Sequence, residues 1–485
     1  MDADTVLRIK PALTQYLHEF DSCFGRITAR QHLDTYVQGQ LGGLGRKSVE
    51  PMADAAGIPP RNLQEFLSLY RWDESAMRDR LQQLVARRHT HEHTVGIIDE
   101  TSFVKKGSQT ACVQRQHCGA VGKTENCVVS VHLGYATPYF HALLDGELYL
   151  PEGTWHEDRE RCRAVGILDD VVYRPKWKIG LEQVGRARAN GIRFAWITFD
   201  EGYGGKPPFL RALDEIGQNY VGEAPASFTA WTKPPAVLYR EHGNDRLGRP
   251  RKYPRLKVKN NPRAEVRHIA SYSPLFRRED WQTYRVKDGH KGPMVWKAKR
   301  IRVWLQDENG LPTRPHHLLV AYNVLEPEKI KYFISNAPEN TTVETLLRVA
   351  FSRWKIERMF EDGKGELGMD HFEVRKFLSI RRHLILSCVS YLFLAEFHQA
   401  HRGEKPGLDG LPDSHGDKPL GADLDSWRPL LPDVRRVDQP TSGSHTTTQC
   451  QERSQPPQGD AASSARTRAV SDGPTHVSME SFVAL

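Results

Sequence analysis

Short apolar strands alternate with amphipathic helices between about residues 94 and 223, and this alternation constrains the fold more than any other feature of the chain. The pattern predicts strands at residues 94–100, 128–136 and 140–150, a helix at 178–191, a strand at 194–200, a helix at 208–216 and a strand at 219–222. A further strand is predicted at 332–336, and a long helix begins after Thr341. This order predicts an α/β fold in which a mixed sheet is flanked by helices.

The first 92 residues read as helical, because apolar residues recur there at helical spacing. Two predicted helices meet at a tight turn at Gly57, and Pro59 and Pro60 open the second. Such a pair could form a helix-turn-helix in which Arg61 faces a DNA groove. A small helical bundle without any DNA-binding role has the same pattern, so both interpretations stay open.

Positive charge is concentrated in one segment. The formal net charge of the chain is +8, and residues 240–300 hold 18 Lys or Arg against 6 Asp or Glu, with aromatic residues between them. Such a strip is typical of contact with a phosphate backbone. The candidate contact residues are Arg251, Lys252, Lys257, Lys259, Lys297, Lys299 and Arg300. The alternative is a solvated, basic, β-rich insertion without a ligand.

The composition changes again after the apolar helical stretch near residue 400. Gly, Pro, Ser, Thr and Asp dominate there, and beyond Trp427 the single aromatic residue is Phe482. Such a segment buries too little surface to offset its chain entropy, so we expect it to be disordered. The predicted organisation is a helical domain at 1–92, an α/β domain in two parts at 93–223 and 331–402, a basic β-rich insertion at 224–330 and a disordered tail at 403–485.

Several classes of protein are disfavoured by the sequence. The longest apolar stretch, residues 384–397, has 14 residues and is too short to span a bilayer. The N-terminus has no apolar signal core, and the seven cysteines are odd in number and scattered. We therefore expect a protein of the reducing cytoplasm with no membrane partner. His316 and His317 precede a predicted strand, and we expect them at the surface.

Two aspartates, Asp99 and Asp200, each end a predicted apolar strand. Ligands of open α/β sheets bind beyond the carboxyl ends of strands. Two carboxylates held close together repel one another unless a cation lies between them. The pair is therefore a candidate site for a divalent metal ion.

A third carboxylate lies on the long helix after Thr341, for which Thr341 and Glu344 would form a capping box. Arg353, Glu357 and Lys364 follow at spacings of four and seven residues, which places them on one helical face. An ordinary ion pair between Arg353 and Glu357 is the alternative interpretation. The neighbouring acidic residues Glu100, Glu201 and Glu361 are rivals for the three carboxylate positions.

These pieces together resemble the DDE transposases of bacterial insertion sequences, in the insertion-sequence-four-like group. The resemblance covers residues 94–402 and is carried by IIDETSF around Asp99, TFDEGYG around Asp200 and SRWKIERMFEDGKGELGMDHFEVR around Glu357. The last segment has the spacing R-x3-E-x6-K of that group. One departure is Ala350, which stands where the group usually has a tyrosine three residues before the arginine.

The resemblance implies an RNase H-like catalytic domain in which Asp99, Asp200 and Glu357 hold two Mg²⁺ ions, with Mn²⁺ as a substitute. It implies that Arg353 and Lys364 hold DNA phosphates. The implied activity is cleavage of insertion-sequence ends and joining of their 3′-hydroxyls to target DNA. The implied partners are double-stranded DNA (terminal inverted repeats and target) and a second copy of the chain in a homodimer on paired ends. The alternatives are an RNase H-like nuclease that cuts without joining and a non-catalytic DNA-binding protein derived from a transposase.

Overall fold

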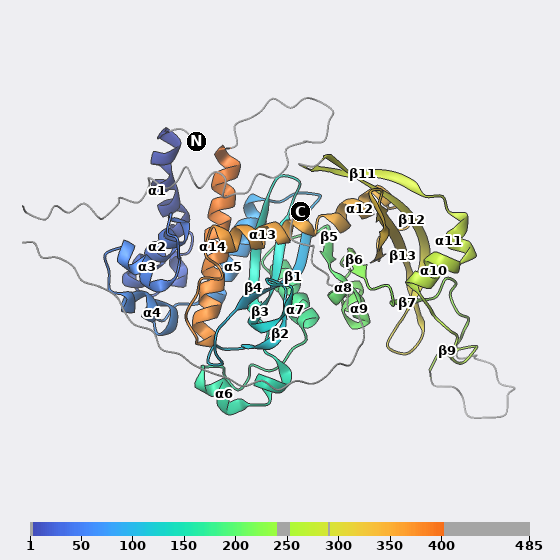
Figure 1. Cartoon of the computed structure of the whole chain (residues 1–485), viewed down its shortest axis with the longest axis horizontal. Helices are drawn as coiled ribbons and strands as arrows, with labels where there is room; N and C mark the ends of the chain where they lie inside the picture. Colours follow the sequence, from blue (N-terminus) through green and yellow to red (C-terminus); the bar gives the residue numbers. More distant parts are fainter. Residues whose placement is uncertain (1–2, 240–252, 290–291, 402–485) are drawn as a thin grey trace, which may run out of the picture. The chain divides into compact units, whose positions relative to one another are not determined.

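The structure, a computed structural model, describes residues 3–239, 253–289 and 292–401. Its centre is a ten-stranded mixed sheet in the order β11-β12-β13-β14-β6-β5-β1-β3-β2, with β4 also paired to β3 (Figure 1). The strands of its first half are β1 Val95–Val104, β2 Gln114–Cys118, β3 Lys123–Ala136, β4 His141–Leu148, β5 Trp196–Phe199 and β6 Tyr220–Ala224. The predicted fold class, a mixed sheet flanked by helices, is confirmed.

Five of these strands form the RNase H-like core. β3 pairs antiparallel with β1 along one edge and with β4 along the other. β5 runs parallel to β1, and β6 runs parallel to β5. The two parallel connections contain helices because a parallel crossover needs a dozen residues or more. These helices are α7 Lys176–Ala189, α8 Glu201–Gly204 and α9 Pro207–Glu215.

The segment predicted as an insertion continues the same sheet instead of forming a separate one. β14 pairs antiparallel with β6, and β13, β12 and β11 follow in order. Two helices also belong to the segment, so it is not purely β. Its elements are β7 Thr229–Ala230, β8 Val237–Leu238, β9 Arg255–Leu256, β10 Ala264–Glu265, α10 Val266–Tyr272, α11 Pro274–Arg278, β11 Gln282–Gly289, β12 Gly292–Gln306, β13 Pro312–Asn323 and β14 Glu326–Ser335.

The expectation that His316 and His317 lie at the surface is wrong, since both side chains are fully buried in β13. Neighbouring residues of a strand point to opposite faces, and here both faces are covered. Nε2 of His316 lies 3.0 Å from a carboxylate oxygen of Asp214, and Nε2 of His317 lies 2.9 Å from Arg302. Burial next to Arg302 lowers the pKa of His317 to about 4.

Helices cover both faces of the core. Gly180 of α7 packs on Ile98, and Phe209 of α9 packs on Phe199, whereas Arg353 reaches the neighbouring Asp99 on the opposite face. The helices of that second face are α12 Val343–Phe351, α13 Trp354–Gly365 and α14 Phe377–His401. The single long helix predicted after Thr341 is thus two helices, with a turn at Ser352 and Arg353.

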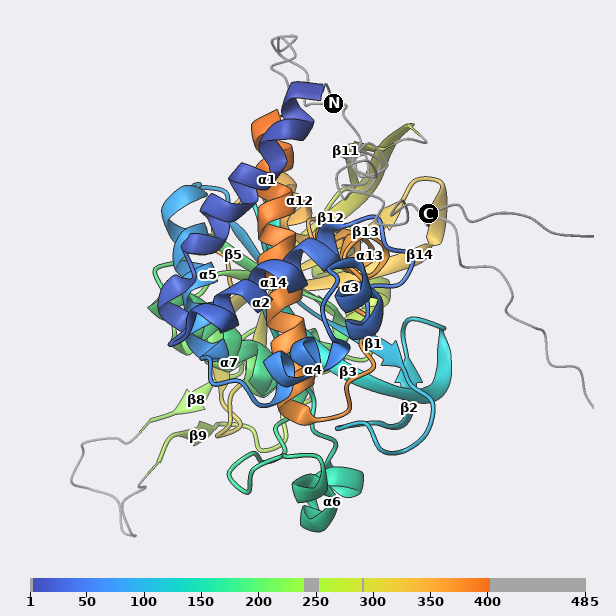
Figure 2. The same ribbon diagram turned by 90° about the vertical axis from the view of Figure 1, so that its left-hand side faces the viewer.

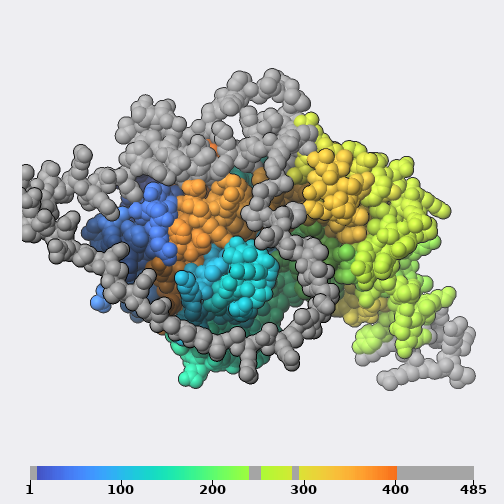
Figure 3. Space-filling view, in the orientation of Figure 1, coloured from blue at the N-terminus to red at the C-terminus, as the bar shows by residue number. Residues whose placement is uncertain are grey.

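The helical prediction for the N-terminal region is confirmed, and its helices pack on α14 (Figure 2). Their bounds are α1 Ala3–His18, α2 Ile27–Leu41, α3 Val49–Ala55, α4 Pro60–Ser68 and α5 Glu74–Arg88. The Tyr16 hydroxyl donates to the carbonyl of Val389 (2.8 Å), and the hydroxyl of Tyr36 lies 2.8 Å from Nδ1 of His383. Figure 3 shows the blue surface of these helices meeting the orange surface of the segment near residues 350–400.

α14 is longer than the 14-residue apolar stretch predicted from the sequence. Within the part of the chain that the structure describes, it is the one helix whose length and composition would suffice to cross a membrane. However, 89% of the most apolar 18-residue stretch of this helix is buried inside the protein. The apolar residues of α14 therefore serve as the surface on which the N-terminal helices and β4 pack.

The close approach of α8 to β6 suggests a test by paired glycine substitutions. In Gly204→Ala the new methyl carbon would lie 1.8 Å from the carbonyl oxygen of Glu223, so α8 would have to move. We expect the variant to lose about 1–3 kcal/mol of unfolding free energy in a denaturant titration. Gly185→Ala is the control, because Gly185 lies inside α7 with open space around it, and alanine there should add up to about 1 kcal/mol. Equal stability of the two variants would contradict this account of α8.

Candidate functional site

Asp99 and Asp200 lie side by side. Ile98 of β1 pairs in parallel register with Phe199 of β5, so the next residues on the two strands are neighbours on one face of the sheet. Asp99 is 8% exposed. The structure therefore brings the two aspartates together.

The prediction that Asp99 ends its strand is wrong, because β1 continues through Val104 and stays paired with β3. Residues 101–104 are Thr, Ser, Phe and Val, of which three types favour strands. Asp99 thus sits in the middle of a strand, opposite His132 of β3. A buried carboxylate in this position needs a partner.

Asp200 directly follows β5 and caps the short helix α8. Its Oδ1 accepts hydrogen bonds from the backbone N–H groups of Gly202 (2.9 Å) and Tyr203 (3.3 Å). Aspartate is favoured at such a position because it pairs with free N–H groups at the helix start. Both capping hydrogen bonds go to Oδ1, so Oδ2 takes no part in them. These hydrogen bonds fix the direction of the side chain.

Glu357 lies in the first turn of α13. The predicted capping box of Thr341 and Glu344 is wrong. The N-cap of α12 is Thr342, whose hydroxyl accepts from the backbone N–H of Thr345 (3.1 Å). α12 ends at a tight turn in which the Ser352 hydroxyl donates to the carbonyl of Val349, and α13 begins one residue after Arg353.

Arg353 joins two of the three carboxylates. Its Nη1 donates to Oδ2 of Asp99 (2.8 Å), and its Nη2 lies 2.7 Å from Oε1 of Glu357. Across the described residues, no group of three His, Cys, Asp or Glu side chains converges as ligands for one ion. In this arrangement the guanidinium group lies between Asp99 and Glu357.

The surroundings shift the ionisation of the site. Burial raises the pKa of Asp99 against the opposing charge of Arg353, and with the added repulsion from Asp200 the value reaches about 7. The pKa of Asp200 is also raised, chiefly by burial, against the effect of Arg353. Burial lowers the pKa of Arg353, but Asp99 and Glu357 more than offset this and keep it above its usual value.

The donor set suits a hard divalent cation. Mg²⁺ prefers oxygen ligands, and Asp99, Asp200 and Glu357 supply carboxylate oxygens from two adjacent strands and the facing helix. Burial of an adjacent carboxylate pair is unfavourable without positive charge nearby. The residues present therefore fit a divalent metal ion in ligand chemistry, while in this arrangement Arg353 holds Asp99 and Glu357.

Two of the three rival carboxylates have other partners. Glu100 pairs with Lys176 of α7, and it accepts a hydrogen bond from the Tyr203 hydroxyl (3.3 Å). Glu361 pairs with Arg358 at 3.0 Å, and its side chain is 71% exposed. Glu201, in the first turn of α8, is exposed.

Lys364 lies on α13 but contacts β1. Its ammonium group donates to the carbonyl of Ser102 (3.2 Å) and lies 5.5 Å from the centre of the Phe103 ring. Burial lowers its pKa. Lys364 therefore fixes the far end of α13 against the extension of β1 beyond Asp99.

The contacts that surround Glu100 were not predicted from the sequence. Tyr203 and Lys176 lie in the α8 and α7 segments, and neither was among the predicted site residues. A signal existed only for Tyr203, which stands three residues after Asp200, one helical turn away. These contacts link β1, α7 and α8 directly beside the two aspartates.

The residues predicted to bind DNA are spread over different environments. Arg61 is exposed on α4, where it pairs with Glu65, and Lys257 and Lys259 are exposed after β9. On β12, Lys297 is half-buried and Lys299 lies over the rings of Phe276 and Trp281. Arg300 donates to the carbonyl of Thr341. Arg251 and Lys252 lie outside the described residues.

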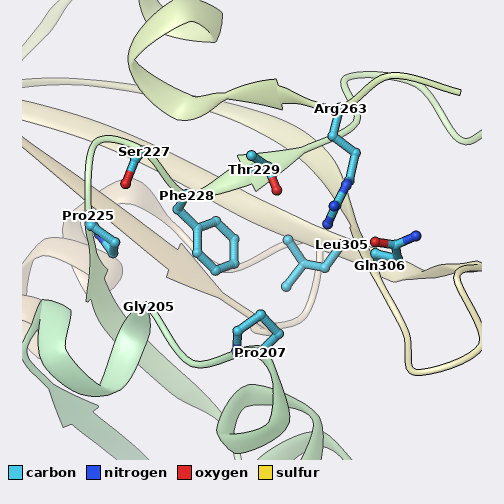
Figure 4. A pocket seen from close by; sticks show the side chains of 9 residues that line it. All are labelled: Gly205, Pro207, Pro225, Ser227, Phe228, Thr229, Arg263, Leu305 and Gln306. Atoms are coloured by element: carbon cyan, nitrogen blue, oxygen red, sulfur yellow. The ribbon is translucent and has the colours of Figure 1, made fainter. Parts of the chain in front are cut away.

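A pocket of about 200 Å³ lies beyond the carboxyl end of β6, next to the α8–α9 turn. Phe228, Pro207 and Leu305 supply apolar walls, and Arg263 of the basic segment extends toward Leu305 and Gln306 (Figure 4). This cation therefore points toward the neighbouring strand β12. Position in the basic segment alone does not tell whether a cation is available to a ligand.

The raised pKa of Asp99 predicts a pH dependence of stability. The carboxyl binds its proton more tightly in the folded chain (pKa about 7) than in the unfolded one (3.8), so stability is lost as pH rises through this range. Asp99→Asn removes that loss. We expect the melting temperature of the variant, relative to the wild type, to rise from about pH 5 to about pH 8 in metal-free buffer. If the melting temperatures of the variant and the wild type differ by the same amount from pH 5 to pH 8, the buried environment assigned to Asp99 is wrong.

Comparisons with known proteins agree with this geometry. A family model described as DDE superfamily endonuclease matches residues 19–293. The chain is also 30% identical, over 211 residues, to a protein of Microchaete diplosiphon named "Probable transposase for insertion sequence element IS701". The aligned part is 43% of this chain and 52% of that relative, so the chain spans about half the length of the curated relative that it matches.

The matched segment contains Asp99 and Asp200 but ends before Glu357. The family match therefore does not reach Glu357, which forms an ion pair with Arg353 in the structure. More than half of the chain lies within the family match, and the sheet has the RNase H-like order. The chain belongs to the DDE superfamily endonucleases, as its resemblance to the DDE transposases of bacterial insertion sequences indicated.

Proposed function

We propose that this protein is a transposase that cuts the ends of its own insertion element and joins the freed 3′-hydroxyls to target DNA. The observation that carries the proposal is the adjacency of Asp99 and Asp200 on parallel strands, with Glu357 connected to them through Arg353. The relative named as a probable transposase supports the same assignment. The proposed catalytic groups are the three carboxylates.

In the proposed active state, Asp99, Asp200 and Glu357 hold two Mg²⁺ ions, for which Mn²⁺ can substitute. When bound, such ions stabilise the charge that develops on the attacked phosphodiester and its leaving oxygen. The protein contributes position: β1 holds Asp99, Asp200 directly follows β5, and Glu357 in the first turn of α13 is linked to Asp99 through Arg353. Rigid strands place ligands more accurately than loops do.

Cationic residues would then hold the DNA. Arg353 offers a fork of donors beside the carboxylates, and Lys364 lies near the end of the following helix, α13. The exposed cations of α4 and of the segment after β9 (Arg61, Lys257, Lys259) would contact the backbone outside the cleavage site. We propose terminal inverted repeats and target DNA as the partners, bound by a homodimer on paired ends in the bacterial cytoplasm and at the nucleoid.

The first test is a cleavage assay on DNA that carries both flanks of the gene, with Mg²⁺, Mn²⁺ or EDTA. We expect metal-dependent breaks at fixed positions, and a loss of at least about 100-fold in rate in Asp99→Asn, Asp200→Asn and Glu357→Gln. Glu361→Gln is the matched control, because Glu361 lies on the same helix and pairs with Arg358 away from the aspartates. Its cleavage rate should be within about threefold of the wild-type rate.

The same assay separates the alternatives. Cleaved ends that become joined to a supercoiled target support a transposase, whereas cleavage without joined products would indicate a nuclease. DNA binding that is equal in the wild type and in the Asp99 variant, without any cut, would indicate a non-catalytic DNA-binding protein. Loss of cleavage in Glu361→Gln but not in Glu357→Gln would overturn the assignment of the third carboxylate.

Exposure divides the predicted DNA contacts into two groups, and salt dependence can distinguish them. We expect Lys257→Ala and Lys259→Ala each to reduce the slope of log affinity against log salt by about 1, since each removes a phosphate contact. Lys299→Ala should leave the slope unchanged and instead reduce stability, because this side chain packs over Phe276 and Trp281. Equal slopes for all three variants and the wild type would exclude this surface from DNA binding.

A further inference from the structure

Arg353 occupies the carboxylate oxygens that a divalent cation would need. Its two terminal nitrogens contact Oδ2 of Asp99 and Oε1 of Glu357 at 2.8 and 2.7 Å. The Asp99 carboxylate uses its other oxygen, Oδ1, to accept the backbone N–H of Glu100 (2.8 Å). A cation at Oδ2 of Asp99 would compete with the guanidinium for the negative charge of the same oxygen.

We infer that Arg353 couples metal binding to DNA binding. In the metal-free chain its guanidinium is the counter-ion of Asp99 and Glu357, and metal ions displace it, which frees it to hold a phosphate of the DNA. This inference rests on the proposed function, because it assumes that the carboxylates bind the metal. It adds an order of events: the phosphate-binding group becomes available only when the site is loaded.

The electrostatics require such an exchange. Arg353 is largely buried, with 23% of its side chain exposed, and a buried cation needs an anionic partner throughout. Divalent ions that take Asp99 and Glu357 remove both partners of Arg353 and add positive charge beside it. A new anionic partner would then stabilise the guanidinium most. A phosphodiester accepts the paired hydrogen bonds of a guanidinium as well as a carboxylate does.

The position of Arg353 allows the side chain to change partners without unfolding a helix. It lies at the tight turn between α12 and α13, where its backbone N–H makes only a long bond (3.5 Å) to the Ala350 carbonyl. The Glu357 side chain is 59% exposed, so the ion pair between Arg353 and Glu357 is open to solvent. Lys364 offers no equivalent exchange, since its ammonium group donates to the Ser102 carbonyl and not to a site carboxylate.

The test compares metal affinity and DNA affinity in the full-length protein. Mn²⁺ binding without DNA is measured from the electron paramagnetic resonance signal of the free ion, and DNA binding is measured in Ca²⁺ and in EDTA. We expect Arg353→Gln to bind Mn²⁺ about tenfold more tightly than the wild type, because the competing cation is gone. The same variant should lose the gain in DNA affinity that the wild type shows on adding Ca²⁺.

Two variants separate the exchange from a simple change of charge. Arg353→Lys keeps the positive charge but cannot bridge both carboxylates, so it should also bind Mn²⁺ more tightly than the wild type. A field effect alone would leave this variant at the wild-type affinity. Arg348→Gln removes one charge at an exposed position of α12 and should bind Mn²⁺ as the wild type does.

The outcomes distinguish this inference from the proposed function. If Mn²⁺ binding is lost in Asp99→Asn but is equal in the wild type and Arg353→Gln, the metal site stands and the exchange is wrong. If the wild type binds no Mn²⁺ that depends on Asp99, the proposed metal site itself fails. If Ca²⁺ raises DNA affinity equally in the wild type and Arg353→Gln, Arg353 does not deliver the phosphate contact.

Discussion

Two carboxylates held side by side in the interior of a sheet are the constraint on which the rest of the site depends. The register of β1 and β5 forces Asp99 and Asp200 together, and burial raises the pKa of both. The face of the sheet that carries them must therefore receive positive charge from elsewhere in the fold. Arg353 supplies it from the turn between α12 and α13, and the same turn directs Glu357 toward the aspartates.

The sequence was sufficient for features that depend on neighbouring residues. The order of the strands and helices around the site, the pairing of each aspartate with an apolar strand, and Glu357 one turn after Arg353 all follow from local spacing. The extension of β1 past Asp99 was missed because an Asp-Glu pair within a strand normally signals its end. What makes the strand tolerate Asp99 is a counter-ion 254 residues away along the chain, and no local pattern records that contact.

The basic segment shows a second limit of local reasoning. Counting charges identified residues 240–300 correctly as cationic, but adjacent residues of a strand point to opposite faces, so their environments differ. Lys299 packs over aromatic rings on one side of β12, and Arg300 on the other side holds the Thr341 carbonyl just before α12. Some of the cations in such a segment therefore stabilise the fold, and pairing partners decide which ones remain available to a polyanion.

The helix that carries Glu357 is held at both ends by different parts of the chain. Arg353 attaches its start to Asp99, whereas near its end Lys364 donates to the Ser102 carbonyl. Lys47, from the segment between α2 and α3, donates to the carbonyl of Glu366 directly after α13, so the N-terminal helices also hold this helix in place. α14 packs on those helices and on β4 as well, so the N-terminal region is joined to the sheet through it. The geometry of the three carboxylates is thus a property of the whole packed unit, in which the helical region contributes to the site without supplying a carboxylate to it.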